Sequence, residues 1–291
     1  MRMIKDNRKI AAVVVTYNNA FMIKVLVDDL LHQTRMPDEI IVIDNSSNDL
    51  AEKKLMEVLP NITYLKMIEN IGSEGGYYEG IKIALENDND LILTLDDDVR
   101  MLENSLEELL GGLKAVEKKD SMVGAVRGVG EWHKDNAPTK LDLFAWRGTL
   151  IKSTAIRKVG LPIKEYFIYG GDLEYSLRLS INGYRFFWVP GSKIVERRIG
   201  GKSWHKRFGK NIFFYTDDFR LYYAFRNEIH LYIKYRLFSK AFRTVLYGVM
   251  LILFFIIHER LRGIGKIKAV IKGFFDGFQS KLGKNKKYLP G

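Results

Sequence analysis

An apolar run that ends in three consecutive aspartates constrains the fold of this chain more than any other feature. Residues 91–99 read LILTLDDDV. A short continuous apolar run predicts a buried strand of a parallel sheet, and ligands of open α/β sheets bind beyond the carboxyl ends of such strands. Three adjacent carboxylates repel one another unless a cation, such as a divalent metal, offsets their charge. Asp96, Asp97 and Asp98 therefore predict either a metal site or a solvated acidic turn.

The sequence before this run alternates between strand and helix patterns. Runs rich in β-branched residues predict strands, and amphipathic stretches with N-capping residues predict helices. The predicted strands are residues 10–15, 39–44 and 62–66, and the predicted helices are residues 22–33, 50–58 and 72–86. This alternation is typical of a doubly wound α/β fold with a mostly parallel sheet and flanking helices.

A glycine-rich segment, Asn70-x-Gly72-x-x-Gly75-Gly76, opens the third predicted helix. Glycines at a helix start let backbone N–H groups approach a phosphate, and the helix dipole favours negative charge there. The segment lacks the GK[ST] ending of a Walker A loop and the spacing of a GxGxxG fingerprint. It therefore indicates either a phosphate-binding turn or a plain helix start.

Six motifs occur in a fixed order along the chain: VVTYN (14–18), IDNSS (43–47), NIGSEGG (70–76), DDD (96–98), FAWRGTLI (144–151) and FIYGGDLEYSLR (167–178). Taken together, they resemble the family 2 glycosyltransferases with the GT-A fold, in their galactofuranosyltransferase- and rhamnosyltransferase-like branch. The resemblance covers about residues 8–235. It implies a Rossmann-like GT-A catalytic domain over residues 1–235, with a nucleotide-sugar half over about 8–100 and an acceptor half over about 101–215. Residues 236–291 would form a helical extension.

Sugar transfer from a nucleotide diphosphate needs a cation for the leaving group and a base for the acceptor hydroxyl. The resemblance implies Mn²⁺ or Mg²⁺ as the cation, with Asp98 as its main ligand and Asp96 assisting. Asp96 and Asp97 would also lie near the nucleotide, and Asp97 is the least defined of the three. This reading favours the metal site over the solvated turn.

The ends of the predicted strands and the glycine-rich segment supply the expected nucleotide and donor contacts: Thr16, Asn18, Asp44, Asn70, Gly75 and Gly76. The resemblance implies that Asp44 accepts a hydrogen bond from the N3–H of uracil or thymine. The alternative is that these residues only cap or open the helices that follow them.

Asp172 is the expected catalytic base, because it follows two glycines at the start of a predicted helix and occupies the position where the family places its base. Glu174 lies two residues later, and residues two apart on a helix do not face the same way. We therefore expect Glu174 to play a supporting part, by orienting a neighbour or contacting the acceptor. Trp146 and Gly171 are expected on the acceptor and sugar side, although Trp146 fits a buried core position equally well.

One position departs from the family pattern. After residues 189–195, VPGSKIV, the family usually has a histidine that completes the metal site, and this chain has Glu196. Glutamate is a suitable ligand for a hard cation, so Glu196 is the expected third ligand. Alternatively, Glu196 pairs with Arg197 or Arg198, and His205 becomes the ligand.

The C-terminal part of the chain is basic and contains an apolar segment. From residue 259 to residue 291, nine Lys and Arg stand against two acids, which places +7 of the net charge of +11 in this tail. Residues 245–257 are almost wholly apolar, but a membrane span needs about 20 residues. We therefore expect a buried or interfacial helix that associates with an anionic membrane surface. The alternative is helices packed on the catalytic domain or on a second copy, and no RNP-type signature suggests nucleic acid.

The chain contains no cysteine, which excludes disulfides and thiolate metal sites, and its first residues lack the apolar core of a signal peptide. We expect a cytoplasmic protein attached peripherally to the inner face of the membrane.

Together these features predict a metal-dependent, inverting hexosyltransferase that uses a UDP- or dTDP-sugar, with galactofuranose or rhamnose as candidates. Its acceptor would be a polyprenyl-diphosphate-linked saccharide in cell-surface polysaccharide synthesis. Two other classes stay open. A sugar-nucleotide-forming nucleotidyltransferase should carry a basic, glycine-rich loop after its first strand, where this chain has TYNN (16–19). A non-catalytic nucleotide-sugar-binding protein would not need Asp172.

Overall fold

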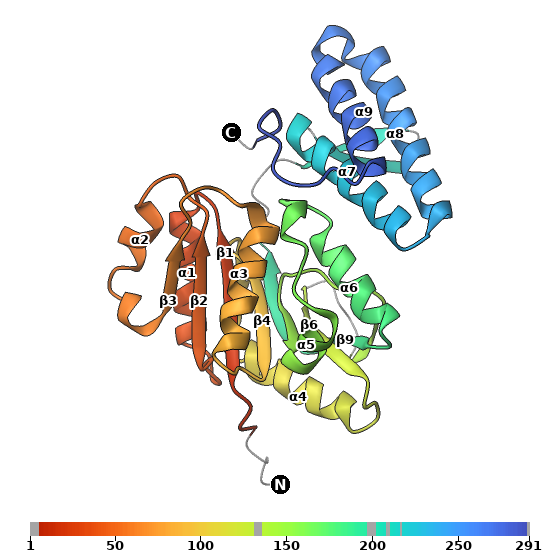
Figure 1. Ribbon diagram of the computed structural model, residues 1–291. Helices are drawn as coiled ribbons and strands as arrows, with labels where there is room; N and C mark the ends of the chain where they lie inside the picture. The colour runs from red at the N-terminus through yellow and green to blue at the C-terminus, as the bar shows by residue number, and fades with distance from the viewer. Residues whose placement is uncertain (1–5, 131–135, 197–201, 208–209, 216, 290–291) are drawn as a thin grey trace. The chain divides into compact units, whose positions relative to one another are not determined.

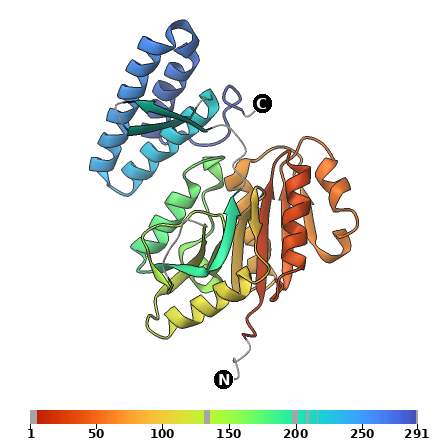
Figure 2. The same cartoon turned by 180° about the vertical axis from the view of Figure 1, so that it is seen from behind.

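The computed structural model describes residues 6–130, 136–196, 202–207, 210–215 and 217–289, and for residues 196, 202–207 and 210–215 it describes the backbone alone. The chain divides into two compact units. One comprises Met1–Ile163 and Asp172–Arg198, and the other comprises Lys164–Gly171 and Ile199–Gly291. The first unit is an α/β sheet domain and the second is mainly helical (Figures 1 and 2).

The sheet of the first unit has a parallel half that follows the predicted order of strands. Its strands are β1 (Ile10–Thr16), β2 (Glu39–Asp44), β3 (Thr63–Lys66) and β4 (Leu91–Asp96). They lie in the order β3-β2-β1-β4, and all three neighbouring pairs are parallel. β1 is buried along its whole length. Its continuous apolar run is what a strand covered on both faces requires. The predicted strand boundaries differ from these by one residue at most.

The other half of the sheet mixes strand directions. It contains β5 (Val99–Met101), β6 (Val123–Val129), β7 (Thr139–Leu141), β8 (Thr149–Lys152) and β9 (Arg185–Glu196). β8 is antiparallel to both β4 and β6, whereas β6 and β9 are parallel. β5 and β7 both pair antiparallel with β9. The complete sheet is therefore mostly, but not wholly, parallel, as expected for the fold class.

Helices cover both faces of this sheet. They are α1 (Ala20–Leu31), α2 (Leu50–Leu55), α3 (Gly72–Glu86), α4 (Ser105–Glu117), α5 (Ser153–Val159) and α6 (Gly171–Ile181). The apolar side chains of α1, α2 and α4 form one core layer with alternate residues of β1, and those of α3, α5 and α6 form the other. Figures 1 and 2 show α3 in front of the sheet in one view and α1 in front of it in the opposite view. This arrangement follows from the alternation of side chains along a strand.

Glycines bring α3 unusually close to β1. A Cβ atom on Gly76 would lie 2.6 Å from Cγ1 of Val15, and one on Gly80 would overlap the side chain of Val13. Both glycines are buried. The glycine-rich start of α3 therefore has a packing function, because it allows the helix to lie directly on the strand whose end carries Thr16.

The second unit is built around three helices, α7 (Asp218–Lys234), α8 (Phe238–His258) and α9 (Ile264–Phe278), with a short 3-10 turn (Arg260–Gly263) before α9. A hairpin of β10 (Lys202–Arg207) and β11 (Lys210–Tyr215) belongs to the same unit (Figure 2). α9 lies close against α7, because Gly273 and Gly277 face the backbone carbonyls of Tyr222 and Arg226. The boundary between the units therefore differs from the predicted end of the catalytic domain at residue 235, because α7 packs with α8 and α9 in the second unit.

The segment Lys164–Gly171 is bound to α7 within this second unit. The side-chain amide of Asn227 donates hydrogen bonds of 2.7–3.0 Å to the carbonyls of Tyr166, Ile168 and Tyr169. Arg226 is fully buried and donates to the carbonyl of Tyr166 at 2.9 Å. Phe167 and Tyr169 have φ values of 65° and 66°, a region that bulky L residues avoid. These hydrogen bonds therefore hold a strained segment.

α8 is longer than the apolar run that predicted it. The helix spans 21 residues, against 13 in the run, because Phe238, Ala241 and Phe242 extend the apolar pattern towards its N-terminus. Among the helices that the structure describes, α8 alone is long and apolar enough to cross a membrane.

Candidate active site

The carboxyl ends of three adjacent strands bring the predicted residues to one edge of the sheet. In the sheet register, Thr16 at the end of β1 pairs with Asp44 at the end of β2. On the other side of β1, Val15 pairs with Asp96 at the end of β4. The aspartate triplet therefore lies beside the end of β1, at the edge where open α/β sheets bind ligands.

Asp97 is tied to the end of β1. Its Oδ2 atom accepts a 2.6 Å hydrogen bond from the Thr16 hydroxyl and a 3.2 Å bond from the Tyr17 N–H. Its Oδ1 atom accepts a 3.0 Å bond from the Asn19 amide. Burial raises the pKa of Asp97 to about 6, although these donors lower it. Asp97 thus joins the end of β4 to the end of β1 and holds these two strand ends in place.

Asp44 is fully buried at the end of β2. One of its oxygens accepts a 2.7 Å hydrogen bond from the Ser46 N–H, and the other accepts a 2.5 Å bond from the Tyr64 hydroxyl. Burial and the Asp44 charge raise the pKa of Tyr64. Each carboxylate oxygen therefore already accepts one hydrogen bond within the protein, and contact with a nucleotide base remains a prediction, which would require access to this fully buried side chain.

Asn45 and Asn18 link the loops around this edge. Asn45 donates a 3.0 Å hydrogen bond to the Gly72 carbonyl and accepts one of 3.1 Å from the Ile71 N–H. The Asn18 N–H donates to the Ser46 hydroxyl at 2.8 Å. Asn70 accepts a 2.8 Å bond from the Gly72 N–H, which is a local turn of the kind that opens a helix. The contact of Asn18 is thus with a neighbouring loop, whereas that of Asn70 lies within its own segment.

Gly75 and Gly76 are buried, so the glycine-rich segment does not present them at the surface. A Cβ on Gly75 would lie 2.9 Å from the side chain of Ile71, within the same segment. These two glycines were expected to contact nucleotide or donor sugar. Their surroundings instead favour the alternative, a helix start built for close packing.

Asp96 belongs to a buried aromatic network. Its Oδ1 atom accepts a 2.5 Å hydrogen bond from the Tyr77 hydroxyl, and the Tyr77 ring stacks on Trp146 with centroids 4.8 Å apart. The indole N–H of Trp146 donates a 3.0 Å bond to the buried carboxylate of Glu74. Trp146 is only 4% exposed, so it occupies a core position and supports Asp96 through Tyr77. Burial therefore favours the core alternative over an exposed surface for sugar stacking.

Two arginines lie near Asp96 and Asp172. Nε of Arg147 is 3.6 Å from Oδ2 of Asp96, and Nε of Arg127 donates a 3.0 Å hydrogen bond to the Arg147 carbonyl. Burial raises the pKa of Asp172, and the charges of Arg147 and Arg127 lower it. Burial also raises the pKa of Asp96, and the nearby charge of Asp172 raises it further. The triplet and Asp172 are thus close enough for their charges to interact.

Asp172 lies in the first turn of α6, which begins at Gly171. Its Oδ1 atom accepts a 2.8 Å hydrogen bond from the Leu173 N–H. A carboxyl whose pKa is raised towards neutrality is well matched to accept a proton. The sequence prediction for this residue is therefore chemically reasonable in its surroundings.

Glu174 points away from this chemistry. It is fully buried and forms a 2.8 Å ion pair with Arg178 one turn later on α6. Arg178 in turn donates 3.0 Å hydrogen bonds to the carbonyls of Val159 and Leu161. Of the two expected roles, orienting a neighbour describes this contact, because the pair fastens α6 to the loop after α5.

The expected metal ligands come together at the level of the backbone. Asp98 lies in the turn between β4 and β5, and Val99, the next residue, pairs with Glu196 in the sheet. The side chains of Glu196 and His205 lie outside what the structure describes, as do Arg197 and Arg198 entirely. Among the described residues, no three His, Cys, Asp or Glu side chains form a group that could hold a metal ion.

A donor set of this kind can still fit Mg²⁺ or Mn²⁺. Such ions are often held by one or two carboxylates together with substrate phosphates, without a complete protein cage. Asp96 ends β4, Asp98 lies in the turn that follows, and the pairing of Val99 with Glu196 brings the backbone of Glu196 beside this turn. The residues at this edge are therefore chemically suitable for a divalent ion shared with a diphosphate.

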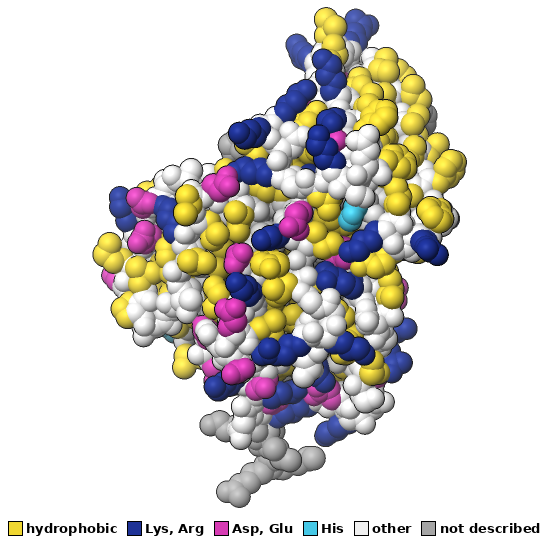
Figure 3. Space-filling model, in the orientation of Figure 1, with side chains coloured by type: hydrophobic (Ala, Val, Ile, Leu, Met, Phe, Trp, Pro, Cys, Tyr) yellow, Lys and Arg dark blue, Asp and Glu magenta, His cyan; other side chains and the backbone are white. Residues whose placement is uncertain are grey.

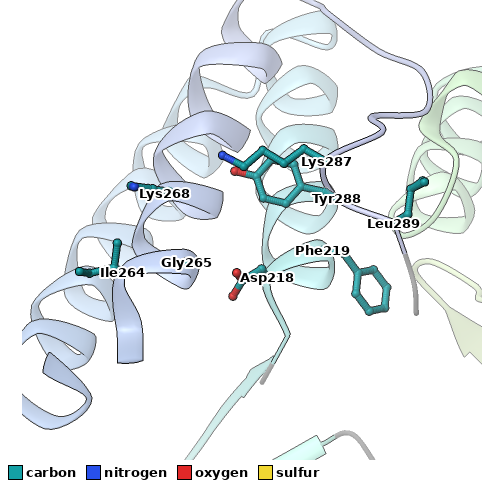
Figure 4. A pocket seen from close by; sticks show the side chains of 8 residues that line it. All are labelled: Asp218, Phe219, Ile264, Gly265, Lys268, Lys287, Tyr288 and Leu289. Atoms are coloured by element: carbon teal, nitrogen blue, oxygen red, sulfur yellow. The ribbon is translucent and has the colours of Figure 1, made fainter. Parts of the chain in front are cut away.

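A pocket of about 370 Å³ lies elsewhere, in the helical unit (Figure 4). Its lining residues come from α7, α9 and the C-terminal segment: Asp218, Phe219, Ile264, Gly265, Lys268, Lys287, Tyr288 and Leu289. None of the predicted site residues lines it. The edge that carries the carboxylates, and not this pocket, is therefore the candidate active site.

Comparison with known proteins identifies the family of this chain. Residues 11–171, more than half of the chain, match the sequence profile described as glycosyl transferase family 2. This chain belongs to glycosyl transferase family 2. The matched region contains β1 from its second residue, β4, the aspartate triplet and Trp146, and it ends at the residue before Asp172.

Two groups of relatives resemble this family 2 glycosyltransferase in sequence. It is 27% identical over 256 residues to galactofuranosyltransferase GlfT1 of Mycolicibacterium smegmatis, covering 76% of this chain and 82% of that protein. It is 25% identical over 274 residues to dTDP-rhamnosyl transferase RfbF of Shigella flexneri, covering 88% of each. The resemblance to the galactofuranosyltransferase- and rhamnosyltransferase-like branch is thus confirmed.

Solved structures confirm the GT-A type of fold. GalNAc-T7 with UDP, GalNAc and Mn²⁺ superposes with a TM-score of 0.60 at 15% identity, covering 78% of this chain and 48% of that one. TarS of S. aureus gives a TM-score of 0.52, also at 15% identity, covering 65% and 37%. This glycosyltransferase thus spans about half the length of the first of these structures and a smaller share of the second.

Sequence reasoning missed four residues of the site. Arg127, Tyr77 and Glu74 received no role, and Arg147 was noted only as part of a motif. The available signal was the family motif around Trp146, which includes Arg147, and the helical spacing of Glu74 and Tyr77 three residues apart. That spacing puts both on one face of α3, but it could not show that the face meets Trp146 and Asp96.

Proposed function

We propose that this glycosyltransferase moves a galactofuranosyl, rhamnosyl or related hexosyl group from a UDP- or dTDP-sugar to a hydroxyl of a saccharide, with inversion at the anomeric carbon. The observation that carries the proposal is that Asp96, at a strand end, and Asp172, at a helix start, lie close enough for their charges to interact, with Arg147 3.6 Å from Asp96. The names of the relatives support the choice of sugars.

Asp172 is the base of the proposed reaction. It takes the proton of the acceptor hydroxyl as that oxygen attacks the anomeric carbon, and the bond from that carbon to the nucleotide diphosphate breaks. A single direct displacement of this kind inverts the configuration. Burial raises the pKa of Asp172, which makes it a stronger base than an ordinary carboxylate at neutral pH.

The departing diphosphate is the other centre of charge. When bound, a divalent metal would neutralise part of this charge, held by Asp98 and Asp96 with Glu196 as the third candidate. Arg147 provides a positive charge of its own at the same place, 3.6 Å from Asp96. Arg127 supports it through the hydrogen bond to its carbonyl. The chain's own residues thus offer carboxylates for the metal ion and a guanidinium group for the leaving diphosphate.

For the nucleotide, the proposed place is the edge formed by the ends of β1 and β2. Thr16 and Asn18 lie there with Asp44, whose carboxylate would accept the N3–H of uracil or thymine. The loops around Asn45 and Asn70 would border the donor sugar.

The acceptor is proposed to be a saccharide carried on a polyprenyl diphosphate, at the cytoplasmic face of a membrane. Support comes from the basic and apolar composition of the C-terminal part of the chain. It also comes from α8, which is apolar and largely exposed.

The decisive experiment compares Asp172→Asn with the native enzyme. Asparagine keeps the shape of the side chain but cannot accept a proton, so we expect transfer to fall by about 100-fold or more, while UDP still binds in the presence of Mn²⁺. Asp88→Asn is the matched control, because Asp88 is exposed at the end of α3 before β4 begins. It should transfer at the native rate.

Three outcomes would contradict the proposal. Transfer by Asp172→Asn within about threefold of the native rate would remove Asp172 as the base. A product with retained anomeric configuration, read by NMR, would exclude direct displacement. If a panel of nucleotide sugars with Mn²⁺ gave binding but neither transfer nor hydrolysis, the chain would be a binding protein.

A further inference from the structure

The outer face of α8 is apolar over nearly its whole length. Its large exposed side chains are Phe238, Phe242, Leu246, Tyr247, Val249, Met250, Leu253, Ile256 and Ile257. No charged residue occurs between Val245 and Ile257. Figure 3 shows hydrophobic side chains gathered along this helix. Contiguous exposed apolar surface of this kind marks an interaction site, because water solvates it poorly.

The inner face of α8 is held by its own unit. Its buried residues are Ala241, Thr244, Gly248, Leu251 and Phe255, spaced three and four apart. Gly248 lies against Phe274 of α9 and Phe225 of α7, and the Thr244 hydroxyl donates a 3.1 Å hydrogen bond to Glu228 of α7. One side of α8 is therefore fixed to protein while the other side is exposed.

A second exposed apolar stripe lies on α9. Ile264, Ile271, Phe275 and Phe278 are exposed on it, at intervals of seven, four and three residues that define one helix face. Both helices of the pair therefore present apolar side chains to solvent.

Positive charge borders this apolar surface. Lys240 and Arg243 lie in the first turns of α8, and Arg260 and Arg262 follow its end. From residue 236 to residue 291 there are only two acids, and both are engaged: Glu259 pairs with Lys266 at 2.7 Å, and Asp276 pairs with Lys272 at the same distance. The charge around the exposed face of α8 is therefore positive at both ends and matches anionic headgroups.

We propose that the exposed face of α8 docks the enzyme on an anionic lipid bilayer, with the helix lying in the plane of the interface. Its apolar side chains would enter the boundary between headgroups and acyl chains, and the four flanking cations would contact phosphates. The proposal goes beyond the transfer reaction and would hold for any reaction at the sheet edge.

The in-plane orientation follows from what α8 packs on. A spanning α8 would carry α7 and α9 into the hydrocarbon with it, and these helices contain the fully buried Arg226 and Asp276, together with exposed Lys268 and Lys272. Charged groups are expensive at the bilayer centre. A helix with protein on one side and lipid on the other avoids that cost, because its partners stay on the aqueous side.

A second copy of the chain fits the same face less well. Pairing two such faces would bring together the cations at the ends of both helices, Lys240, Arg243, Arg260 and Arg262, without an acid on the face to offset them. Like charges at an interface oppose association. A bilayer supplies the missing negative charge.

The first test measures binding of the full chain to vesicles without any donor sugar. The probes are vesicles of phosphatidylcholine alone and vesicles with one part in three phosphatidylglycerol. We expect the native chain to sediment with the anionic vesicles, and the combined variant Phe242→Gln, Met250→Gln, Ile257→Gln to bind at least tenfold more weakly. The matched control is Phe21→Gln, Leu50→Gln, Met56→Gln, which removes similarly exposed apolar side chains from α1, α2 and the residue after it. This control should bind as the native chain does.

A charge variant tests the cations separately. Replacing Lys240, Arg243, Arg260 and Arg262 by glutamine should weaken binding to the anionic vesicles at least tenfold and leave only the residual binding to neutral ones. Equal binding by the native chain and the α8 variant would overturn the proposal. So would a native dimer that the α8 variant converts to a monomer while vesicles bind neither, because the face would then serve a second copy.

The third test measures depth. Because the chain has no cysteine, single variants Phe242→Cys, Met250→Cys and Ile257→Cys can each carry one nitroxide label on a clean background. An in-plane helix places all three labels at a similar shallow depth. A label at Met250 near the bilayer centre, with the other two near opposite surfaces, would show a spanning helix and overturn the orientation. Donor hydrolysis by the same proteins is read separately, so loss of lipid binding and loss of catalysis can be told apart.

Discussion

The Thr16 hydroxyl donates a 2.6 Å hydrogen bond to Oδ2 of Asp97 and thereby joins the end of β1 to the turn after β4. The same carboxylate accepts the Tyr17 N–H and the Asn19 amide. Three donors from one loop therefore converge on a single side chain. Asp97 fixes the place of its two neighbours, Asp96 and Asp98, relative to the nucleotide edge.

Asp97 should make stability depend on pH in an unusual direction. Its pKa is raised to about 6 from an ordinary value of 3.8, so between these values the folded protein holds a proton that the unfolded chain has released. The free energy of unfolding should therefore fall as pH rises through this window. Asp97→Asn removes this dependence, so the difference between native and variant should change with pH in urea unfolding. Parallel pH profiles would contradict the raised pKa.

Arg147 should set the acidic limb of the pH–rate profile. Its charge lowers the pKa of Asp172 against the effect of burial, so Arg147→Gln should raise that pKa further. Asp172 would then lose its proton only at higher pH, and the acidic limb of the kcat/KM profile should shift to higher pH. Arg147→Lys keeps the charge and serves as the control. An unmoved limb in the glutamine variant would separate Arg147 from the base.

Glu174 should matter for stability and not for chemistry. Glu174→Gln breaks a buried ion pair with Arg178, and breaking such a pair costs about 3 kcal/mol or more in the free energy of unfolding. The kcat of the folded fraction should stay near native. Glu86→Gln is the control, because Glu86 forms an exposed pair with Lys82 at the same helical spacing, worth about 1 kcal/mol at most. A large fall in kcat without loss of stability would instead place Glu174 at the acceptor.

Gly80→Ala should test the close contact of α3 with β1. The added methyl group would overlap Val13, and overpacking of this kind costs about 1–3 kcal/mol. Gly111→Ala in α4 is the control, since a Cβ there meets nothing within 4 Å, and alanine favours a helix over glycine by about 1 kcal/mol. The two substitutions should therefore shift the melting temperature in opposite directions. A stabilising Gly80→Ala would mean that α3 can move away from the strand.

The parallel half of the fold could be predicted because its signals are local. Continuous apolar runs defined β1, β2 and β4, and residues at their ends had to meet at one edge of the sheet. The antiparallel insertion of β8 between β4 and β6 could not be predicted in the same way. Pairing between strands far apart in sequence depends on tertiary packing, which the pattern within a strand does not encode.

The candidate site also combines features that local sequence signals predict with contacts that depend on tertiary packing. The sequence predicted that Asp96 and Asp172 serve one site, and the structure brings their charges together. It did not predict that Tyr77 would bond to Asp96 or that Glu74 would bond to Trp146. Those contacts arise between a helix, the end of β4 and the loop before β8, where side chains meet only after the layers have packed. Base recognition by Asp44 remains a prediction, and the contacts that the structure shows for its carboxylate are with Ser46 and Tyr64.

The hydrogen bonds of Asn227 bear on how this enzyme could be shortened. Asn227 supplies the donor for three carbonyls of the segment that runs directly into Gly171 and Asp172. A truncation that ends after β9, made to obtain a tractable catalytic fragment, would leave those carbonyls without it and release Phe167 and Tyr169 from their strained backbone. The helical unit is for that reason not a removable module, and exchanging it between relatives would require the segment and the asparagine to be transplanted together.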